Sequence, residues 1–273
     1  PNGPSGLVAI EIGAEGPALS VSSACASSSD GIGLAWQYIR NGICDAVLTG
    51  GSEATICPVG IASFDRLGAM SRRNSDFSMT PQPFDKNRDG LVMGEGACVL
   101  VLEELNRAKE RGANILAELA GYGITGDAFH ITSPSSDGEG GFRAMVSALE
   151  MAEVNSDKID YINAHGTSTQ IGDDIELKAI MKLIKNHDKI KISSTKSSIG
   201  HLLGAAGSVE AIFSILSINN NIAPATLNLS HPTHNYNIDL VAKKPQEFNI
   251  NYALSNSFGF GGTNTALLFK SFA

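Results

Sequence analysis

Cysteine and tryptophan are scarce in this chain, whose 273 residues include four Cys and one Trp. The cysteines, at positions 25, 44, 57 and 98, form no C-x-x-C pair. The cysteines therefore form neither a disulfide framework nor the close Cys pair that is typical of a zinc site. A chain of this length can bury a core without disulfides, so we expect reduced thiols and a cytoplasmic location.

The chain also lacks an excess of positive charge, long apolar runs and a signal peptide. Its formal net charge of −8 argues against nucleic-acid binding, because neutralising phosphates requires surplus lysine and arginine. No apolar run approaches the length that spans a bilayer, and the most apolar late segment, 211–218, contains two serines. The N-terminus, P-N-G-P, has no initiator Met and no basic region, and we expect it to lie inside a longer chain.

Short apolar runs alternate with amphipathic segments, and many of the 29 glycines lie between them. Strands are predicted over 18–24, 46–49, 97–102, 115–122, 159–164, 191–195, 252–257 and 265–269. Helices are predicted over 30–40, 103–111, 142–154, 173–185 and 202–218, and a loop over 133–141. The alternation predicts an α/β protein with a mixed sheet covered by helices on both faces.

The segment V-S-S-A-C-A-S-S, residues 21–28, places Cys25 where a predicted strand ends and a predicted helix begins. Unpaired backbone N–H groups and the helix dipole favour a thiolate at such a position, so we expect the pKa of Cys25 to be lowered. Small neighbours would let a substrate carbonyl approach the sulfur. A buried, inert cysteine is the alternative, because that is the usual state of a free Cys.

Three further segments combine small residues with groups that can perform chemistry. N-A-H-G-T-S-T (163–169) and S-T-K-S-S-I-G-H (194–201) each place a histidine at the end of a predicted element, where active-site groups are commonly presented. S-N-S-F-G-F-G-G-T-N (255–264) is glycine-rich, but no helix follows it, so it is not a dinucleotide fingerprint. Such a turn can direct backbone N–H groups at a ligand oxygen; a plain hairpin turn would not need its two phenylalanines.

Taken together and in this order, the four segments resemble the elongating β-ketoacyl-(acyl carrier protein) synthases of the thiolase-fold superfamily. Further matches are M-S-R-R-N (70–74), P-F-D-K-N-R-D-G (83–90), G-E-G (94–96), and Gly172-Asp173 followed by Glu176. The resemblance implies a thiolase-like layered αβαβα fold with mixed sheets. Residues 1–112 would be the remainder of the N-terminal half and 113–273 the C-terminal half. Family members are roughly half again as long, so the first half is expected to be incomplete.

The resemblance also implies roles for individual residues. Cys25 would take the acyl group as a thioester, and the backbone N–H groups of Cys25 and Phe260 would bind the oxyanion. His165 and His201 would assist loss of CO₂ from the malonyl thioester and stabilise the enolate. Phe258 and Phe260 would form a gate between the cysteine and the malonyl side.

Other implied roles concern charge and substrate binding. Lys196 would orient the two histidines electrostatically, with Glu210 as its partner. Thr167 and Thr169 would hydrogen-bond the pantetheine arm of the substrate. Arg73 matches a residue that docks the acidic carrier protein.

The expected activity is decarboxylative condensation in fatty acid biosynthesis, without a cofactor. The expected partners are acyl- and malonyl-loaded acyl carrier protein and a second copy of the chain, with no nucleic acid or membrane. Zinc bound by Cys25, His165 and His201 is disfavoured, because no two of them have short metal-ligand spacing. A polyketide ketosynthase and a truncated, non-catalytic scaffold remain alternatives. An incomplete sheet would expose edges and apolar surface, so the chain alone is expected to be poorly soluble or inactive.

Overall fold

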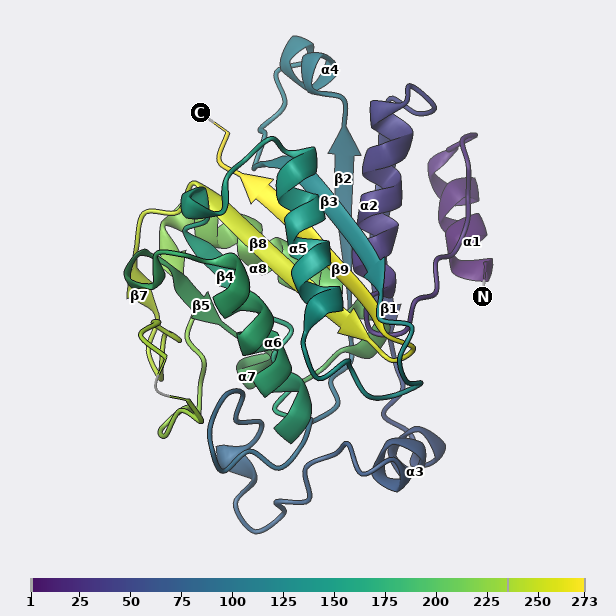
Figure 1. The fold of residues 1–273 in the computed structure, drawn as a ribbon. Helices are drawn as coiled ribbons and strands as arrows, with labels where there is room; N and C mark the ends of the chain where they lie inside the picture. The colour runs from purple at the N-terminus through teal and green to yellow at the C-terminus, as the bar shows by residue number, and fades with distance from the viewer. Residues whose placement is uncertain (1, 235, 273) are drawn as a thin grey trace.

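A five-stranded mixed sheet forms the centre of the structure, a computed structural model that describes residues 2–234 and 236–272 (Figure 1). Its strands, in spatial order, are β3 (Glu118–Gly126), β9 (Thr263–Lys270), β8 (Tyr252–Gly259), β4 (Tyr161–Asn163) and β5 (Lys191–Ser193). β4 is parallel to β5 and β8, whereas β9 is antiparallel to β3 and β8. The final hairpin predicted from the sequence is therefore confirmed.

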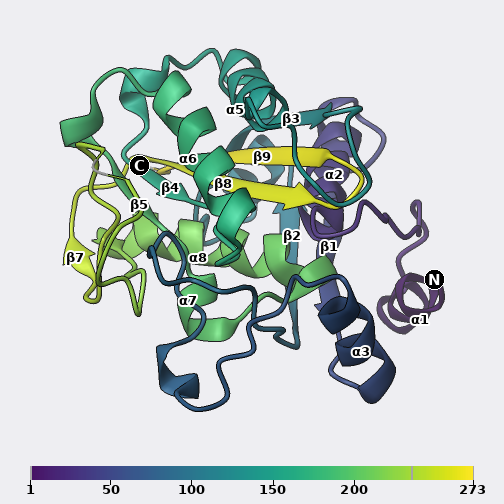
Figure 2. The same ribbon diagram turned by 60° about the horizontal axis from the view of Figure 1, so that its bottom comes forward.

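Helices cover both faces of this sheet (Figure 2). α5 (Glu139–Met151) and α6 (Gln170–Leu183) pack on one face, and α2 (Ser27–Arg40) and α8 (Ala206–Asn220) on the other. Side chains alternate along β9 between the two cores: Ala266 and Leu268 join the first, and Leu267 and Phe269 the second. This is why the strand reads as one continuous apolar run in the sequence.

Two glycines of β3 allow α5 to lie unusually close to the sheet. A Cβ added to Gly121 would meet the carbonyl oxygen of Ala148 at 2.0 Å, and one added to Gly123 would meet that of Ala144 at 1.9 Å. The backbones of strand and helix are thus in direct contact at these positions, and no larger residue could occupy them without separating the two elements.

A second sheet is formed by β1 (Ala46–Glu53) and β2 (Gly96–Glu103), an antiparallel ribbon on the far side of α2 and α8. The order of layers is therefore helix, sheet, helix, sheet. The outer face of the ribbon is apolar and open: Leu48 is 42% exposed, Val99 56% and Val101 67%. The predicted layered α/β fold with a reduced first half is confirmed. The boundary at residue 112 stays a prediction, because α2 and α8, from opposite sides of it, share one layer.

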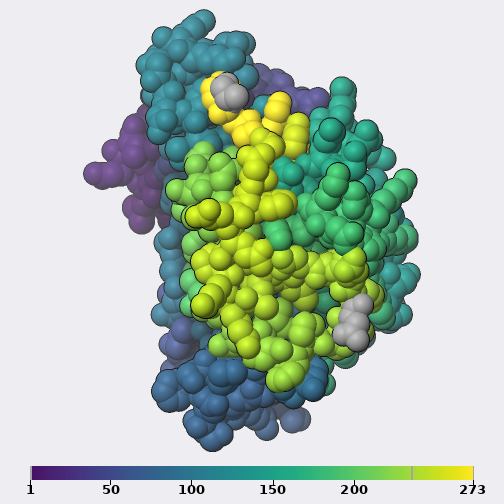
Figure 3. Space-filling view, turned by 90° about the vertical axis from the view of Figure 1, so that its left-hand side faces the viewer, coloured from purple at the N-terminus to yellow at the C-terminus, as the bar shows by residue number. Residues whose placement is uncertain are grey.

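The remaining elements lie around these layers. They are α1 (Gly3–Ile12), α3 (Pro58–Arg66), α4 (Leu105–Glu110), α7 (Lys196–Ile199), β6 (Ile222–Ala223) and β7 (Gln246–Glu247). The segment that follows α8, yellow-green in Figure 3, spreads over one side of the molecule. Within residues 2–234 and 236–272, no helix has both the length and the apolar character needed to cross a membrane.

Three local predictions were wrong or incomplete. Residues 18–24 form no strand: in the described parts of the chain their one β-bridge joins Ser23 to Cys25, and most of them are exposed. A strand requires a partner for its backbone groups, which local sequence does not reveal. α5 begins at Glu139, inside the predicted loop. α1 and α3 were not predicted, and α1 buries none of its residues.

The exposed ribbon face predicts how the chain behaves in solution. Replacing Val99 and Val101 by Thr should reduce hydrophobic-dye binding and aggregation. Because both side chains are exposed, the free energy of unfolding should change by less than about 0.5 kcal/mol. Leu100→Thr is the control, because Leu100 packs on the core beneath the ribbon and its loss should destabilise the fold. Unchanged aggregation of the double variant would show that this face does not limit solubility.

Candidate active site

A cavity of about 460 Å³ brings together residues that are far apart in the sequence. Its wall contains most of the side chains singled out from the motifs, namely Cys25, His165, Thr167, Thr169, His201, Phe258 and Phe260. Lys196, Glu210 and Arg73 are not in this wall. The four sequence motifs, 21–28, 163–169, 194–201 and 255–264, therefore form a single site.

The backbone around Cys25 is a tight turn immediately before α2. Ala26 N–H donates to the carbonyl of Ser23 at 3.1 Å, and Ala24 has a left-handed φ of 53°. Gly259, in the final hairpin, lies against this turn: a Cβ there would sit 2.8 Å from the Ser23 oxygen and 3.1 Å from the Cys25 nitrogen. Only glycine permits this approach, which brings the hairpin turn next to the sulfur.

The thiol of Cys25 is 8% exposed and directly contacts His201, with 3.1 Å between Sγ and Nε2. Burial raises the pKa of Cys25 to about 11, although the positive charge of Lys196 and the backbone N–H of Phe260 both lower it. The lowered pKa expected from the sequence is therefore wrong. Loss of hydration at the buried sulfur outweighs the helix terminus and the nearby cation. The resting group is a thiol that can donate its proton to His201.

The two histidines meet edge to face, with 5.2 Å between their ring centroids. Burial lowers the pKa of both well below the ordinary value, and the charge of Lys196 lowers them further. Both imidazoles are therefore neutral at pH 7. The turn of His165 is held by Glu176, whose carboxylate accepts the N–H groups of His165 at 2.8 Å and Gly166 at 2.7 Å.

Lys196 and Glu210 form a buried ion pair beneath the site. Nζ of Lys196 contacts Oε1 of Glu210, and each side chain is only 1% exposed. Burial raises the pKa of Glu210 to about 7, and the adjacent ammonium lowers it. The pair connects α7 to α8 and places a positive charge close enough to influence Cys25 and both histidines.

The residues expected to contact substrate have clear positions. Thr167 and Thr169 lie in the cavity wall with their hydroxyl oxygens 3.0 Å apart. The ring centroid of Phe258 is 5.9 Å from that of His165, and the ring of Phe260 stacks on Phe64 at 6.3 Å. The two phenylalanines thus lie on either side of Gly259, one toward the histidines and one toward α3.

Arg73 has a different environment from the one expected of a docking residue. Its guanidinium donates to the side chain of Gln82 and, at 2.6 Å, to the carbonyl of Asn87. Arg66, at the end of α3, is exposed, whereas Arg72 pairs with Asp65. Of these three arginines, Arg66 is the one that is exposed and has no ion-pair partner among residues 2–234 and 236–272, so its charge is accessible.

Sequence reasoning missed a carboxylate that supports the cysteine turn. Asp30, buried in α2, accepts hydrogen bonds from Ser23, from Thr265 at 2.6 Å and from Tyr122 at 3.1 Å. It thereby ties the residues before Cys25 to β9 and β3. An acidic residue in the first turn of a helix is usually attributed to the helix dipole, so its sequence position gave no separate signal.

No group of three or more His, Cys, Asp or Glu side chains is arranged to hold a metal ion within 2–234 and 236–272. The side chains at the site offer proton donors and acceptors and a sulfur nucleophile. The arrangement can therefore perform covalent acyl transfer with acid–base assistance from imidazole.

Comparisons with known proteins identify the family of the chain. The family models for beta-ketoacyl synthase, N-terminal domain, and beta-ketoacyl synthase, C-terminal domain, match residues 1–108 and 116–230. The 3-oxoacyl-[acyl-carrier-protein] synthase 2 of Rhizobium meliloti is 51% identical over 98% of this chain and 64% of its own length. The protein of that name from Staphylococcus aureus is 47% identical over 100% of this chain and 66% of its own length. The chain thus spans less than two thirds of the first relative's length and about two thirds of the second's.

Solved structures give the same result. A beta-ketoacyl synthase from Burkholderia phymatum superposes with a TM-score of 0.95 at 40% identity, covering 100% of this chain and 66% of that one. A ketosynthase solved with its type II PKS acyl-carrier protein has a TM-score of 0.95 at 36% identity, covering 98% and 66%. Because both domain models match in chain order and nearly every residue of this chain superposes on these structures, the chain belongs to the β-ketoacyl synthase family.

Proposed function

We propose that the protein is a 3-oxoacyl-(acyl carrier protein) synthase that condenses an acyl thioester with malonyl-carrier in fatty acid biosynthesis. The observation that carries the proposal is a buried thiol 3.1 Å from a neutral imidazole, with a second neutral imidazole beside it in one cavity. This is the set of groups that acyl transfer followed by decarboxylation requires.

In the first half-reaction Cys25 becomes acylated. Its sulfur attacks the carbonyl of the acyl-carrier thioester while its proton passes to Nε2 of His201. The C–S bond to the carrier breaks, and the departing carrier thiolate takes the proton. The backbone N–H groups of Cys25 and Phe260 stabilise the negative oxygen of the tetrahedral intermediate. A thiol with a raised pKa is suited to this route, since it is deprotonated only when a substrate and a base are both in place.

In the second half-reaction the malonyl thioester loses CO₂. The electrons of the broken C–C bond form an enolate whose oxygen accepts hydrogen bonds from the imidazoles of His165 and His201. The enolate carbon then attacks the Cys25 thioester, the new C–C bond forms, and the sulfur leaves as a thiolate. One proton taken up from solvent restores the thiol and replaces the proton that left with the first carrier. Thr167 and Thr169 bind the pantetheine arm, and Phe258 and Phe260 separate the acyl and malonyl sides.

A fatty acid pathway is favoured over a polyketide pathway by degree of similarity. The two 3-oxoacyl-carrier synthases are 47–51% identical, whereas the type II PKS ketosynthase is 36% identical and a ketosynthase of the bacillaene synthase from Bacillus subtilis is 28% identical. A non-catalytic scaffold is disfavoured by the geometry, because nothing in such a role requires a thiol in contact with an imidazole.

The proposal extends to partners and location. The substrates arrive on acidic acyl carrier protein, which we place at the cavity mouth near Arg66 and Arg73. We also propose a cytoplasmic homodimer, in keeping with the family and with the open apolar ribbon. Arg66→Glu should raise the KM for acyl-carrier, because the charge is accessible, while alkylation of Cys25 stays unchanged.

Cys25 is the first residue to test. Cerulenin, an epoxide inhibitor of β-ketoacyl synthases, should modify Cys25 and spare the exposed Cys57 and the buried Cys98, as mapped by mass spectrometry. Because burial raises the pKa of Cys25 to about 11, its alkylation by iodoacetamide should keep accelerating above pH 9. Equal modification of all the cysteines, or none at Cys25, would contradict an assembled condensing site.

A substitution at His165 should distinguish the two half-reactions. His165→Ala should slow condensation by about 10²–10⁴-fold, because the enolate loses a hydrogen-bond donor. Acylation of Cys25 should remain within tenfold of the unmodified protein, since His201 and not His165 contacts the sulfur. Mass spectrometry of the acyl-enzyme and an assay of 3-oxoacyl product distinguish the steps. An equal loss of rate in acylation and condensation would refute the proposal that His165 acts only in the second half-reaction.

The ion pair between Lys196 and Glu210 should affect both the stability of the fold and the pH dependence of condensation. Glu210→Leu leaves Lys196 unpaired and should destabilise the fold by about 3–5 kcal/mol, whereas Lys196→Met with Glu210→Leu should recover most of that loss. Without the lysine charge, the pKa of both histidines should rise, and the acidic limb of the condensation rate should move to higher pH. Urea unfolding and a pH–rate profile measure the two effects. An unshifted acidic limb would exclude Lys196 from electrostatic control of the histidines.

A further inference from the structure

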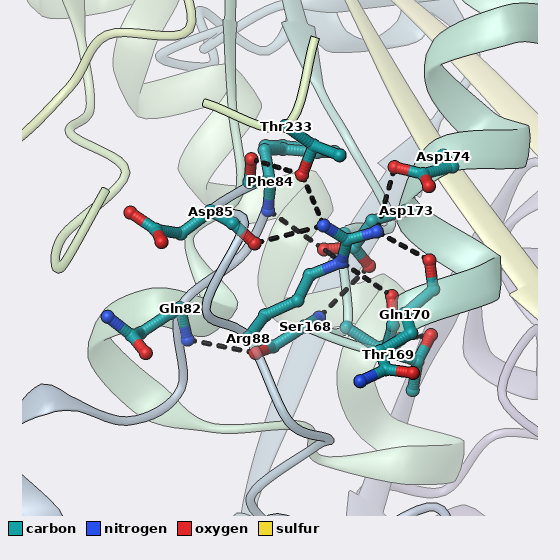
Figure 4. Close-up of polar contacts among 12 residues, drawn as sticks. Gln82, Phe84, Asp85, Arg88, Ser168, Thr169, Gln170, Asp173, Asp174 and Thr233 are labelled. Atoms are coloured by element: carbon teal, nitrogen blue, oxygen red, sulfur yellow. Dashed lines mark hydrogen bonds and ion pairs between the residues drawn. The ribbon is translucent and has the colours of Figure 1, made fainter. Parts of the chain in front are cut away.

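Residues 82–94 form a strap that runs across the cavity region before β2, and its contacts reach both histidine turns. Near its end, His201 N–H donates to the carbonyl of Val92 at 2.7 Å, and Gly94 N–H donates to the carbonyl of His201 at 2.9 Å. Nearer its start, the strap contacts residues 165–170, hereafter the threonine turn, which carry His165, Thr167 and Thr169 (Figure 4).

Ser168, at the centre of the threonine turn, is fixed on every side. Its φ of 71° is left-handed, a conformation that non-glycine residues adopt only when surrounding contacts impose it. Its hydroxyl accepts the N–H of Gln82 at 2.9 Å, and its carbonyl accepts the N–H of Gly90 at 3.0 Å. Its own N–H donates to Asp173 at 3.0 Å.

Asp173 links the threonine turn to the strap. Its fully buried carboxylate accepts Ser168 N–H through one oxygen and Phe84 N–H, at 2.9 Å, through the other. Phe84 is a second left-handed residue, with φ of 65°. One carboxylate thus holds a strained residue in each segment. Nε of Arg88 lies 3.6 Å from the oxygen that binds Phe84.

Arg88 uses all of its hydrogen-bonding capacity at this junction. The side chain is 3% exposed, and a guanidinium has five N–H groups in a fixed fork. The five acceptors are the carbonyls of Thr169 (2.9 Å), Gln170 and Asp85 (2.9 Å), the hydroxyl of Thr233 and the carboxylate of Asp174 (2.7 Å). Two of them are consecutive carbonyls at the end of the threonine turn, where α6 begins.

We propose that Arg88 is a positioning residue that sets the threonine turn for binding of the thioester substrate; this rests on the proposed function. Arg88 is not part of the cavity wall, so it acts through the turn and not on substrate. By fixing the carbonyl of Thr169, it fixes the backbone that presents the Thr167 and Thr169 hydroxyls, which lie 3.0 Å apart in the wall.

Lysine could not perform this role. It would keep the positive charge but offers three donors on one nitrogen, which cannot reach acceptors arranged around a planar fork. Burial already raises the pKa of Asp173 to about 7, with Arg88 among the groups that lower it. Arg88→Lys keeps a cation in the region. Comparing this variant with the unmodified protein therefore tests the planar geometry of the guanidinium more than its charge.

The first experiment compares Arg88→Lys with Arg107→Lys in steady-state condensation assays. Arg107 is the matched control because it is 59% exposed and pairs with Asp45 and Glu103 away from the cavity. Arg88→Lys should raise the KM for malonyl-carrier at least tenfold. The rate of Cys25 alkylation by iodoacetamide should stay within twofold, because Arg88 does not contact Cys25 or His201. A variant with a lower melting temperature but unchanged KM and kcat would reduce Arg88 to a structural role and overturn the proposal.

The second experiment does not depend on activity. Hydrogen exchange should show that the amides of residues 166–171 exchange at least tenfold faster in Arg88→Lys and at the original rate in Arg107→Lys. Unchanged exchange in the turn would refute the proposal even if the protein is an active synthase. If the unmodified protein fails to condense but the turn still loosens in Arg88→Lys, the proposed function fails and the positioning role of Arg88 stands.

Discussion

The electric field at this site comes largely from one interaction, the ion pair between Lys196 and Glu210, each almost completely removed from water. A buried ion pair is seldom more stable than apolar residues of similar volume, so its presence here is better explained by the field it creates. The ammonium lies close enough to lower the pKa of His165, His201 and Cys25, although burial opposes this effect at the sulfur. Burial is the main cause that lowers the pKa of both imidazoles, and the lysine charge adds to it, so both stay neutral, the state in which they can accept a proton or donate one.

Burial raises the pKa of the thiol and lowers the pKa of the imidazoles at the site. It disfavours charge on sulfur and on imidazole alike, so the resting state is uncharged at Cys25, His165 and His201. In the proposed mechanism the contact between Cys25 and His201 activates the sulfur, because proton transfer to the imidazole would accompany attack on the substrate. The close approach of Gly259 brings the hairpin turn against the backbone of Cys25, where the proposed mechanism places N–H groups, and not charges, around the oxyanion.

The layers of the fold explain how residues from distant segments meet. The segments that follow β4 and β5 carry the histidines, the hairpin of β8 and β9 brings its glycine turn to Cys25, and α2 and α8 join the two sheets. The strap of residues 82–94 then ties both histidine turns together from outside the sheet. No further layer covers the apolar outer face of β1 and β2, which carries the exposed Leu48, Val99 and Val101.

The sequence by itself determined the α/β class, the central strands and the four segments that form the site, because apolar periodicity and glycine-rich turns are local properties. It also carried the family resemblance that assigned Cys25, His165 and His201 to one reaction. Tertiary structure alone decided that 18–24 is not a strand, that the guanidinium of Arg73 is engaged within the chain, and that Arg88 fastens the threonine turn. It also decided the raised pKa of Cys25. These properties arise from burial and from contacts such as that between Cys25 and His201, 176 residues apart, which no local pattern specifies.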